Sequence, residues 1–334
     1  MRSIFAVMAV GAVAVGFAGP AMAQDPDGIL VYSAQHASLT REWAEAFTAE
    51  TGIPVTIRQG TDMQMANQIV QEGVNSPADL FLTENSPAMM MVDQAGLFAP
   101  VDPETLAQIP EAYRPASGNW TGIAARTTVF VYNTNLLAEE DLPVSMVDLM
   151  DPSWAGRWGA APAGADFQAI VGALLLIEGE DLTADWLHAL REGAERYRGN
   201  SEAMRAVNIG EIDGAVIYHY YWFGDQARTG ENSNNTRLHY FGAQDAGAFV
   251  SISGGGVIAS SGNLDQAQAF LKWITGPTGQ TILRDGTSYE YAIGSGIAAN
   301  PMLPPLDTLD APVVDPSNMD ARSVVELMAA AGLL

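Results

Sequence analysis

Short apolar runs alternate with stretches of helical periodicity through the first third of the chain. The runs at 28–33, 53–57 and 79–82 have the length and flanking residues of buried strands. Between them, 39–51 and 64–72 place apolar residues at helical spacing, and a glycine follows each of these two segments. Strands that alternate with helices at this interval build parallel sheets with crossover helices. The sequence therefore predicts an α/β fold.

Elements of both kinds continue through the rest of the chain. The expected strands are 129–132 and the glycine-rich 251–259, whose glycines indicate a place where two backbones approach closely. Apolar residues at helical spacing predict further helices at about 167–177, 183–196, from Ser201, at 264–275 and at 324–331. A chain of 334 residues can form two domains.

Aromatic residues concentrate in one stretch, since five of the six residues at 218–223 are aromatic and the sixth is His219. The preceding 214–217 predicts a buried strand. Adjacent residues of a strand point to opposite faces, so Tyr220 and Tyr221 can share a ligand only where the strand has ended and the backbone bends. Aromatic residues also suit an ordinary core strand. The pattern leaves two interpretations open, a core strand or two phenol oxygens that converge on a hard cation or a polar ligand.

Two polar side chains follow the predicted N-terminal strands. His36 comes after 28–33, and Glu84 comes after 79–82. In open α/β sheets ligands bind outside the carboxyl ends of the strands, so both residues are candidates for ligand binding. Each also has a structural alternative. His36 can be a hydrogen-bonded polar residue at a strand end, and Glu84 can cap a helix that starts at Pro87.

The N-terminal segment predicts export. Arg2, the apolar run 4–18 and the small residues around Met22 form the pattern of a secretory signal, so we expect residues 1–23 to be removed. The sequence contains no cysteine, which excludes a lipoprotein signal and disulfide bonds. We therefore expect a freely soluble periplasmic protein that is not inserted in the membrane.

Acidic residues dominate the charge. The formal net charge is −24, and removal of 1–23 takes away Arg2 and no acid, which leaves −25. Nucleic-acid binding needs clustered Lys and Arg, and so does binding to an anionic membrane surface, so the composition disfavours both. An acidic surface raises the local concentration of cations, but it also serves solubility.

Several segments, taken in order, resemble those of a known family. They are 32–36, 76–84, 122–126, Asn200 with Ser201, and 210–213 leading to 220–222. Together they span nearly the whole chain beyond the signal, and they resemble the ferric-ion-binding periplasmic proteins of bacterial iron ABC transporters. The acidic loop and the Tyr-Tyr-Trp triplet are the most specific parts.

This resemblance implies four ligands for one Fe(III) ion, namely His36, Glu84, Tyr220 and Tyr221. It implies a periplasmic-binding-protein fold in which two α/β lobes, each a central sheet flanked by helices, are joined by hinge strands with the ligand cleft between them. The lobes would comprise 24–125 plus about 251–302, and about 126–250 plus 303–334. The implied partners are an inner-membrane ABC permease and its ATPase, and we expect the protein itself to be a monomer.

The chemistry of these side chains suits Fe(III). A hard cation prefers oxygen to sulfur ligands. A phenol, with a pKa near ~10, is mostly protonated at neutral pH, but a highly charged metal ion beside it removes the proton. Two phenolates and one carboxylate balance three positive charges, the imidazole binds neutral, and two octahedral positions remain. Binding should therefore release protons and weaken in acid.

The family closes the remaining positions with a bound anion such as phosphate or carbonate. The residues that match its anion site are the loop Ala163, Gly164 and Ala165, whose N–H groups precede a helix, together with Asn85 and Asn200, and Arg126 is a candidate counter-charge. As an alternative, Arg126 is a surface or interlobe residue.

The sequence departs from the family at three places near this anion. Tyr218 stands where Asn is common, Ala163 stands where Ser is frequent, and Asp166 adds a negative charge just beyond the loop. Tyr218 shares strand parity with Tyr220, so it is either an additional ligand or a packing residue.

Two other classes of function remain open. Related lobed proteins bind thiamine, phosphonates or polyamines, and 220–222 could stack on a cationic ring or an amine. A serine hydrolase could use Ser253 beside the glycines 254–256, but nothing marks its His or Asp. The sequence contains no Gly-x-Ser-x-Gly and no His-Glu-x-x-His motif. We therefore expect a binding protein and not an enzyme.

Overall fold

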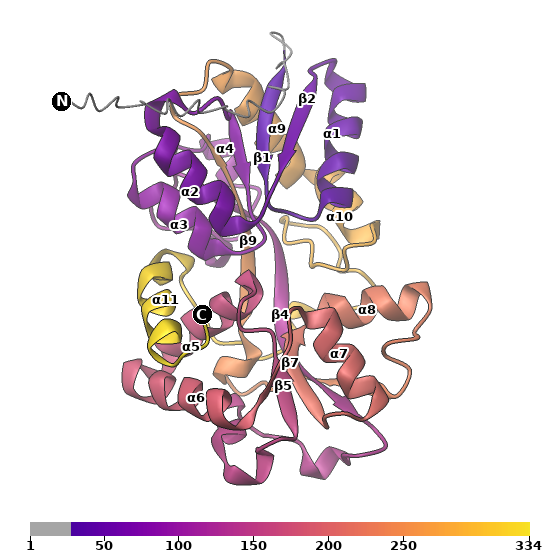
Figure 1. The fold of residues 1–334 in the computed structure, drawn as a ribbon. Helices are drawn as coiled ribbons and strands as arrows, with labels where there is room; N and C mark the ends of the chain where they lie inside the picture. Colours follow the sequence, from indigo (N-terminus) through magenta and orange to yellow (C-terminus); the bar gives the residue numbers. More distant parts are fainter. Residues whose placement is uncertain (1–27) are drawn as a thin grey trace, which may run out of the picture.

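Two α/β lobes lie one above the other in the computed structural model, which describes residues 28–334 (Figure 1). The predicted signal segment 1–23 lies outside the described residues. The strands are β1 (Ile29–Ser33), β2 (Val55–Gln59), β3 (Leu80–Leu82), β4 (Thr121–Asn133), β5 (Trp158–Ala160), β6 (Glu195–Arg196), β7 (Gly214–Tyr218), β8 (Thr236–His239) and β9 (Val250–Val257). They follow the order β2-β1-β3-β9-β4-β7-β5-β6, and β8 also pairs with β4. The predicted α/β class and two-lobed architecture are confirmed.

Helices cover both lobes (Figure 1). They are α1 (Ala37–Thr51), α2 (Asp62–Glu72), α3 (Ser86–Gln94), α4 (Pro103–Leu106), α5 (Ala165–Glu178), α6 (Glu180–Gly193), α7 (Asn200–Ile209), α8 (His219–Arg228), α9 (Leu264–Thr275), α10 (Pro277–Asp285) and α11 (Ala321–Ala330). Within residues 28–334, none of these helices has both the length and the apolar character needed to cross a membrane.

The upper lobe is built on the predicted parallel strands. β1 pairs in parallel with β2 on one side and with β3 on the other, and α1 and α2 provide the crossovers. β2 begins two residues later than predicted, after Pro54, which has no N–H to donate to a ladder. The carboxyl end of β1 points toward the lower lobe (Figure 1), and β3 runs parallel to β1. Residues that follow these strands therefore face the other half of the molecule.

β4 belongs to both lobes. Its first half, 121–127, pairs antiparallel with β9, and its second half, 128–132, pairs antiparallel with β7. All thirteen residues are buried. The sequence predicted a strand only at 129–132, because 121–128 is rich in Thr, Gly and Ala and lacks the apolar run that marks a buried strand. Together with β9, this strand forms the connection between the lobes that the resemblance implied.

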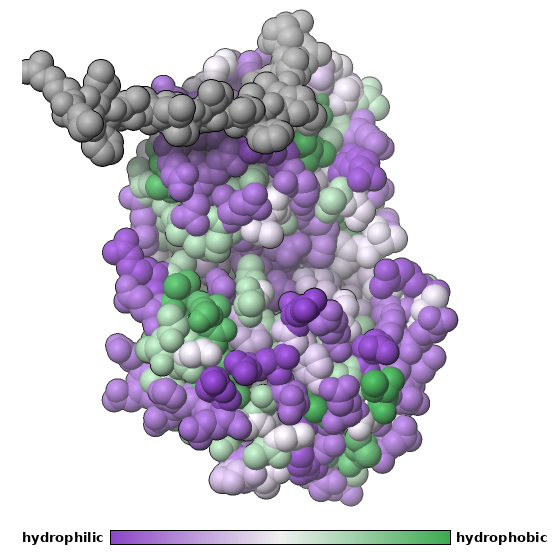
Figure 2. Space-filling view, in the orientation of Figure 1, coloured by the Kyte–Doolittle hydropathy of each residue, from purple (hydrophilic) through white to green (hydrophobic). Residues whose placement is uncertain are grey.

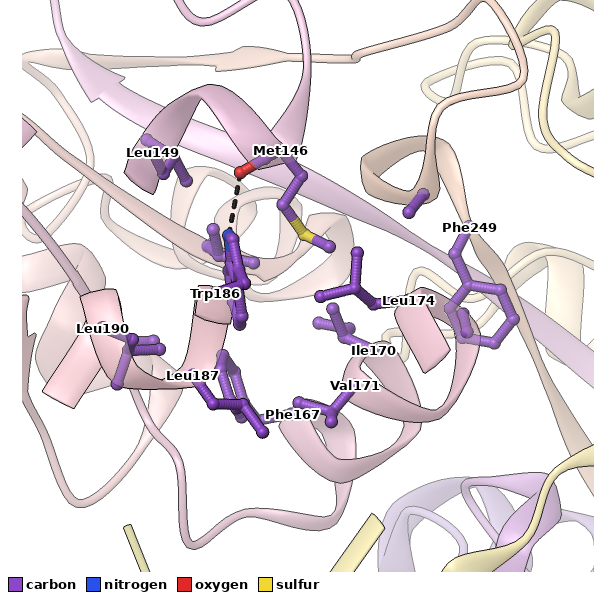
Figure 3. Close-up of a cluster of buried hydrophobic side chains, with 14 of the residues drawn as sticks. Met146, Leu149, Phe167, Ile170, Val171, Leu174, Trp186, Leu187, Leu190 and Phe249 are labelled. Atoms are coloured by element: carbon purple, nitrogen blue, oxygen red, sulfur yellow. Dashed lines mark hydrogen bonds between the residues drawn. The ribbon is translucent and has the colours of Figure 1, made fainter. Parts of the chain in front are cut away.

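The lower lobe has its own apolar core between α5, α6 and the strands (Figure 3). Trp186 on α6 stacks on Phe167 of α5 with 5.8 Å between ring centroids. Its indole N–H donates to the carbonyl of Met146 at 2.9 Å, so the one polar atom of this large side chain is satisfied. α6 ends at Gly193, three residues before the predicted end, because Glu195 and Arg196 continue as the edge strand β6.

The glycines of β9 make room for side chains. A Cβ atom on Gly254 would lie 2.3 Å from Met89, and one on Gly256 would lie 2.7 Å from the ring of Phe98. The sequence predicted a close approach of two backbones here. The atoms that approach closely are side chains of the upper-lobe core, which pack directly against the sheet surface.

The C-terminal helix α11 contacts both lobes. It packs on α5 and α6 of the lower lobe and on α3 of the upper lobe. Just before it, Met319 accepts a hydrogen bond from the hydroxyl of Ser86, at the start of α3, with an S···O distance of 3.2 Å. Hydrophilic side chains cover most of the face shown in Figure 2, and an apolar patch lies over α11, where Val325 is exposed.

Candidate metal site

His36 and Glu84 meet at the carboxyl ends of the upper-lobe strands. His36 follows β1 and precedes α1, and Glu84 lies between β3 and α3. The imidazole Nδ1 lies 3.4 Å from the Glu84 carboxylate. The carboxylate of Asp62 holds the turn, because it accepts from the backbone N–H groups of Glu84 and Asn85 at 2.9 and 3.0 Å. The strand-end argument therefore located both side chains correctly.

Tyr220 and Tyr221 lie in the first turn of α8, directly after β7 ends at Tyr218. This is the bend that the strand geometry required for the two phenols to act together. Their rings stack with 4.3 Å between centroids, and the Tyr220 ring stands edge-on to His36 at 5.0 Å. Side chains of both lobes therefore converge on one place.

A cavity of about 550 Å³ opens between the lobes at this place. Its lining includes His36 and Glu84 from the upper lobe and Asp166, Asn200 and Tyr221 from the lower lobe. The loop residues Ala163, Gly164 and Ala165 also line it. Gly164 donates its N–H to the carbonyl of Ala161 at 3.1 Å, so this donor is already used within the loop.

The carboxylate of Asp166 lies at the centre of the polar contacts. One of its oxygens, Oδ2, accepts from the hydroxyls of Tyr220 and Tyr221, each at 3.0 Å, and from the amide of Asn200 at 2.9 Å. The other oxygen accepts from the amide of Asn85 at 3.1 Å. The sequence identified Asp166 as a nearby charge but gave it no partner, because the four donors come from three segments that are distant from it in the sequence.

Tyr218 reaches the site only through Asn85. Its hydroxyl donates to Asn85 Oδ1 at 3.3 Å, and the hydroxyl of Ser251 donates to the same oxygen at 2.8 Å. These two bonds orient the Asn85 amide toward Asp166. Tyr218 is fully buried and is not among the residues that line the cavity.

Arg126 is a buried residue of β4 and pairs with Glu290, which is equally buried. The guanidinium lies over the ring of Tyr220, 5.6 Å from the centroid. The other oxygen of Glu290 is 3.7 Å from His36 Nε2. Sequence reasoning missed Glu290, since it lies in an irregular segment without a periodic pattern. Arg126 thus lies beside the site, but its charge is already matched.

Burial sets the protonation of the site. It raises the pKa of Glu84 to about 8, a rise that Asp166 and Asp62 increase and Arg126 opposes. Burial, helped by the charge of Arg126, lowers the pKa of His36 to about 3. Burial also raises the pKa of each phenol of the Tyr pair above its usual value. At neutral pH the imidazole is therefore neutral, and Glu84 and both phenols keep their protons until a cation displaces them.

This site differs from metal centres built only of His, Asp, Glu or Cys, because two of its candidate ligands are tyrosine hydroxyls. Within residues 28–334, no three His, Asp or Glu side chains come close enough together to hold a metal ion by themselves. The His36 and Glu84 pair needs further donors, and the opposite lobe brings a phenol beside it, since the Tyr220 ring lies 5.0 Å from that of His36. Such an oxygen-rich set suits a hard cation.

The residues on which the organic-ligand and serine-hydrolase alternatives depend do not have the arrangement that those functions need. Trp222 donates its indole N–H to Thr236 at 3.1 Å and does not line the cavity, so the aromatic triplet offers no shared stacking face. Ser253 is fully buried, and its hydroxyl contacts the carbonyl of Glu84 at 3.1 Å and Glu290 at 3.2 Å. No histidine is hydrogen-bonded to it among the described residues.

Known proteins with similar sequences are solute-binding proteins, in agreement with the two-lobed fold and with the resemblance found in the sequence. Residues 75–312 match the family described as bacterial extracellular solute-binding protein. The chain is 58% identical over 316 residues to the Fe(3+)-binding periplasmic protein of Serratia marcescens, covering 95% of this chain and 94% of that protein. It is 34% identical over 328 residues to the major ferric iron-binding protein of Neisseria meningitidis serogroup B, covering 96% of this chain and 97% of that protein.

A solved structure extends this likeness to three dimensions. Iron-bound HitA from Pseudomonas aeruginosa superposes with a TM-score of 0.87 at 40% identity, covering 92% of this chain and all of that one. The chain therefore belongs to the bacterial extracellular solute-binding protein family, and the predicted resemblance to its periplasmic ferric-ion-binding members is confirmed.

Proposed function

We propose that this protein is the periplasmic receptor of an iron(III) ABC transporter and binds one ferric ion in the cleft between its lobes. The proposal rests on one observation: His36 and Glu84 of the upper lobe line the same cavity as Tyr221 of the lower lobe, and Tyr220 stacks on Tyr221 with its ring edge-on to His36. The relatives named above, described as ferric-iron-binding, support the choice of metal. In this proposal an inner-membrane permease and its ATPase receive the ion.

The four side chains provide the charge that Fe(III) needs. Two phenolates and the Glu84 carboxylate carry three negative charges, and the neutral imidazole of His36 adds a nitrogen donor. Because these groups come from both lobes, closure of the cleft would complete the coordination shell. We further propose that the lobes comprise 24–125 plus about 251–302, and about 126–250 plus 303–334, and that the protein acts as a monomer. The phosphate or carbonate that the resemblance implies stays a prediction. The contacts of Asp166 bear on whether such an anion binds, because the amides of Asn85 and Asn200, both assigned to the anion, donate to this carboxylate.

Titration of the apo protein with ferric nitrilotriacetate tests the function. The expected result is one ferric ion per chain and a visible absorption band from phenolate-to-iron charge transfer. A flat spectrum, with no iron retained after desalting, rejects the proposal. Thermal-shift measurements with thiamine, phosphonates and polyamines test the organic-ligand alternative. An esterase assay with Ser253→Ala as its control tests the hydrolase.

Ferric binding is expected to strengthen as the pH rises from about 5 to 8. Both phenols and Glu84 are protonated in the empty site, so each bound ion should displace about three protons. The raised pKa of Glu84 places its proton loss near pH 8, so acid opposes binding and alkali favours it. The affinity can be measured by competition with nitrilotriacetate at each pH, after correction for the protonation of the chelator.

Glu84→Gln provides the control for this pH dependence. This variant keeps the shape of the side chain but has no proton to release, so it should release one proton fewer per ion. A corrected affinity that does not change between pH 5.5 and 8 would contradict the ligand set.

A further inference from the structure

His219 joins three elements at the place where the two lobes meet. Its imidazole Nδ1 accepts from the backbone N–H of Thr127 at 3.2 Å, and its Nε2–H donates to the carbonyl of Tyr289 at 2.8 Å. An amide N–H can only donate and a carbonyl can only accept, so these partners fix a neutral ring with its proton on Nε2. His219 is the first residue of α8 and is fully buried. Its imidazole is therefore held in one orientation, with both nitrogens bonded.

Thr127 marks the point at which β4 changes its partners. Residues 121–127 of this strand pair with β9, and residues 128–132 pair with β7. The strand thus passes from the upper lobe to the lower lobe between Thr127 and Thr128. Rotation of one lobe against the other is absorbed by a few residues at such a transition. The imidazole of His219 contacts the connecting strand at this point.

Tyr289 belongs to a segment that is fixed to the upper lobe. Tyr291 exchanges two backbone hydrogen bonds with Ala125 in the first half of β4, at 2.8 and 3.0 Å. The side chain of Gln280, on α10, accepts from the backbone N–H groups of residues 293 and 294, each at 2.9 Å. Because α8 belongs to the lower lobe, the bond from the imidazole to Tyr289 links the two lobes (Figure 1).

The backbone of Tyr289 is strained, and the surrounding contacts hold it in place. Its φ is +56°, in the left-handed region that bulky side chains rarely adopt. Such a conformation persists only where neighbouring groups determine it. The ring of Tyr289 stacks on Phe223 of α8 with 6.3 Å between centroids, and the next residue, Glu290, is paired with Arg126. The carbonyl that accepts from the imidazole therefore has a fixed direction.

This link lies beside the two phenols of the candidate metal site. Tyr220 and Tyr221 directly follow His219 in the first turn of α8, and the His219 ring lies edge-on to Tyr220 with 6.1 Å between centroids. A shift of the imidazole would move the start of α8, and both phenols with it, relative to His36 of the upper lobe. One side chain thus joins the lobes and fixes the turn that carries two candidate ligands.

We propose that His219 is a positioning residue whose bond to Tyr289 holds the lobes in the arrangement that places Tyr220 against His36. This inference rests on the proposed function and deepens it, because it names a group that retains the ion without touching it. Opening of the cleft stretches this bond. Loss of the bond should therefore speed the release of iron.

Two substitutions of His219 separate its two hydrogen bonds. The short amide of Asn takes the place of Nδ1 and can accept from Thr127, whereas the longer Gln takes the place of Nε2 and can donate to Tyr289. Each variant leaves one buried backbone group unpaired, so both should be less stable in urea denaturation. Only His219→Asn breaks the link between the lobes. Mixed with excess EDTA, it should lose its visible iron band about 10-fold faster than the wild type, and His219→Gln should stay within about 3-fold.

His239→Asn is the matched control. The Nε2–H of His239 donates to the carbonyl of Pro143 at 2.9 Å, a bond of the same kind that lies within the lower lobe. This variant should lose stability without a faster release of iron. Small-angle X-ray scattering of the iron-free proteins gives a second reading. The radius of gyration should increase in His219→Asn and stay at the wild-type value in His219→Gln and His239→Asn.

A measurement on the wild type does not depend on the folding of any variant. In iron-free protein labelled with ¹⁵N-histidine, NMR should show the His219 ring protonated on Nε2, with this proton exchanging slowly with water. A ring protonated on Nδ1, or rapid exchange of the Nε2 proton, overturns the link.

The possible failures are distinguishable. Equal release rates and equal radii of gyration for His219→Asn and the wild type overturn the link and leave the receptor function standing. Equally fast release from His219→Asn and His219→Gln does the same, since the effect then does not come from the bond to Tyr289. Wild-type protein that binds no iron overturns the proposed function, and the radii of gyration of the iron-free proteins then decide whether His219 joins the lobes.

Discussion

Replacing both Tyr220 and Tyr221 with Phe is expected to abolish the visible iron band and to weaken ferric binding by at least about 1000-fold, well beyond the 10- to 100-fold of an outer-shell change. The substitutions remove two of the three negative charges that the proposal places on the four predicted ligands. Each lost hydroxyl takes one hydrogen bond from Asp166, a stability cost of about 1 kcal/mol. The variant should therefore fold, and spectrophotometric titration together with metal analysis after desalting would measure the loss.

Tyr218→Phe is the matched control. This phenol lies two residues away and is equally buried, but its hydroxyl donates only to Asn85, which also accepts from Ser251. The control should keep the band and bind iron within about 10-fold of the wild type, as an outer contact would. If Tyr218→Phe loses its colour while the Tyr220 and Tyr221 variant keeps it, the ligand assignment is wrong.

Replacing Arg126 with Met is expected to destabilise the apo protein by about 3–5 kcal/mol. The guanidinium and the carboxylate of Glu290 are both fully buried, so the substitution leaves a negative charge without its partner inside the protein. The double variant Arg126→Met with Glu290→Gln removes both charges and should recover much of the loss. Urea denaturation followed by circular dichroism would give the free energies of unfolding.

Arg157→Met provides the comparison for this pair. Arg157 and Asp213 form an ion pair with an N···O distance of 2.6 Å, but the arginine side chain is 41% exposed. Breaking such a pair costs about 0–1 kcal/mol, because water solvates the remaining charge. A loss of the same small size in Arg126→Met would show that water reaches Glu290 and that this pair does not stabilise the connection between the lobes.

The sequence predicted those features that depend on a pattern within one short segment of the chain. Alternating strands and helices located the parallel half of the upper lobe, and the strand-end rule located His36 and Glu84. The pleat of a strand required a bend before Tyr220 and Tyr221, and the structure has that bend where β7 ends and α8 begins.

Features that depend on distant segments were not predictable in this way. The first half of β4 has few apolar residues, and its burial comes from β9, more than a hundred residues later. The contacts of Asp166 join α5 to residues of α8, α7 and the loop after β3, so no spacing in the sequence indicates them. Glu290 meets Arg126 across an even longer separation of 164 residues.

The pairing of β3 with β9 has a consequence for how the chain matures. Leu80 lies opposite Val257, so half the polypeptide separates two neighbours in one sheet. Contacts of such long range are slow to form, since a large loop must close before they contribute. A nascent chain that emerges N-terminus first therefore cannot complete its upper lobe until most of the lower lobe has been made. Until then β3 lacks one of its two neighbours in the sheet, so its edge stays unpaired during synthesis.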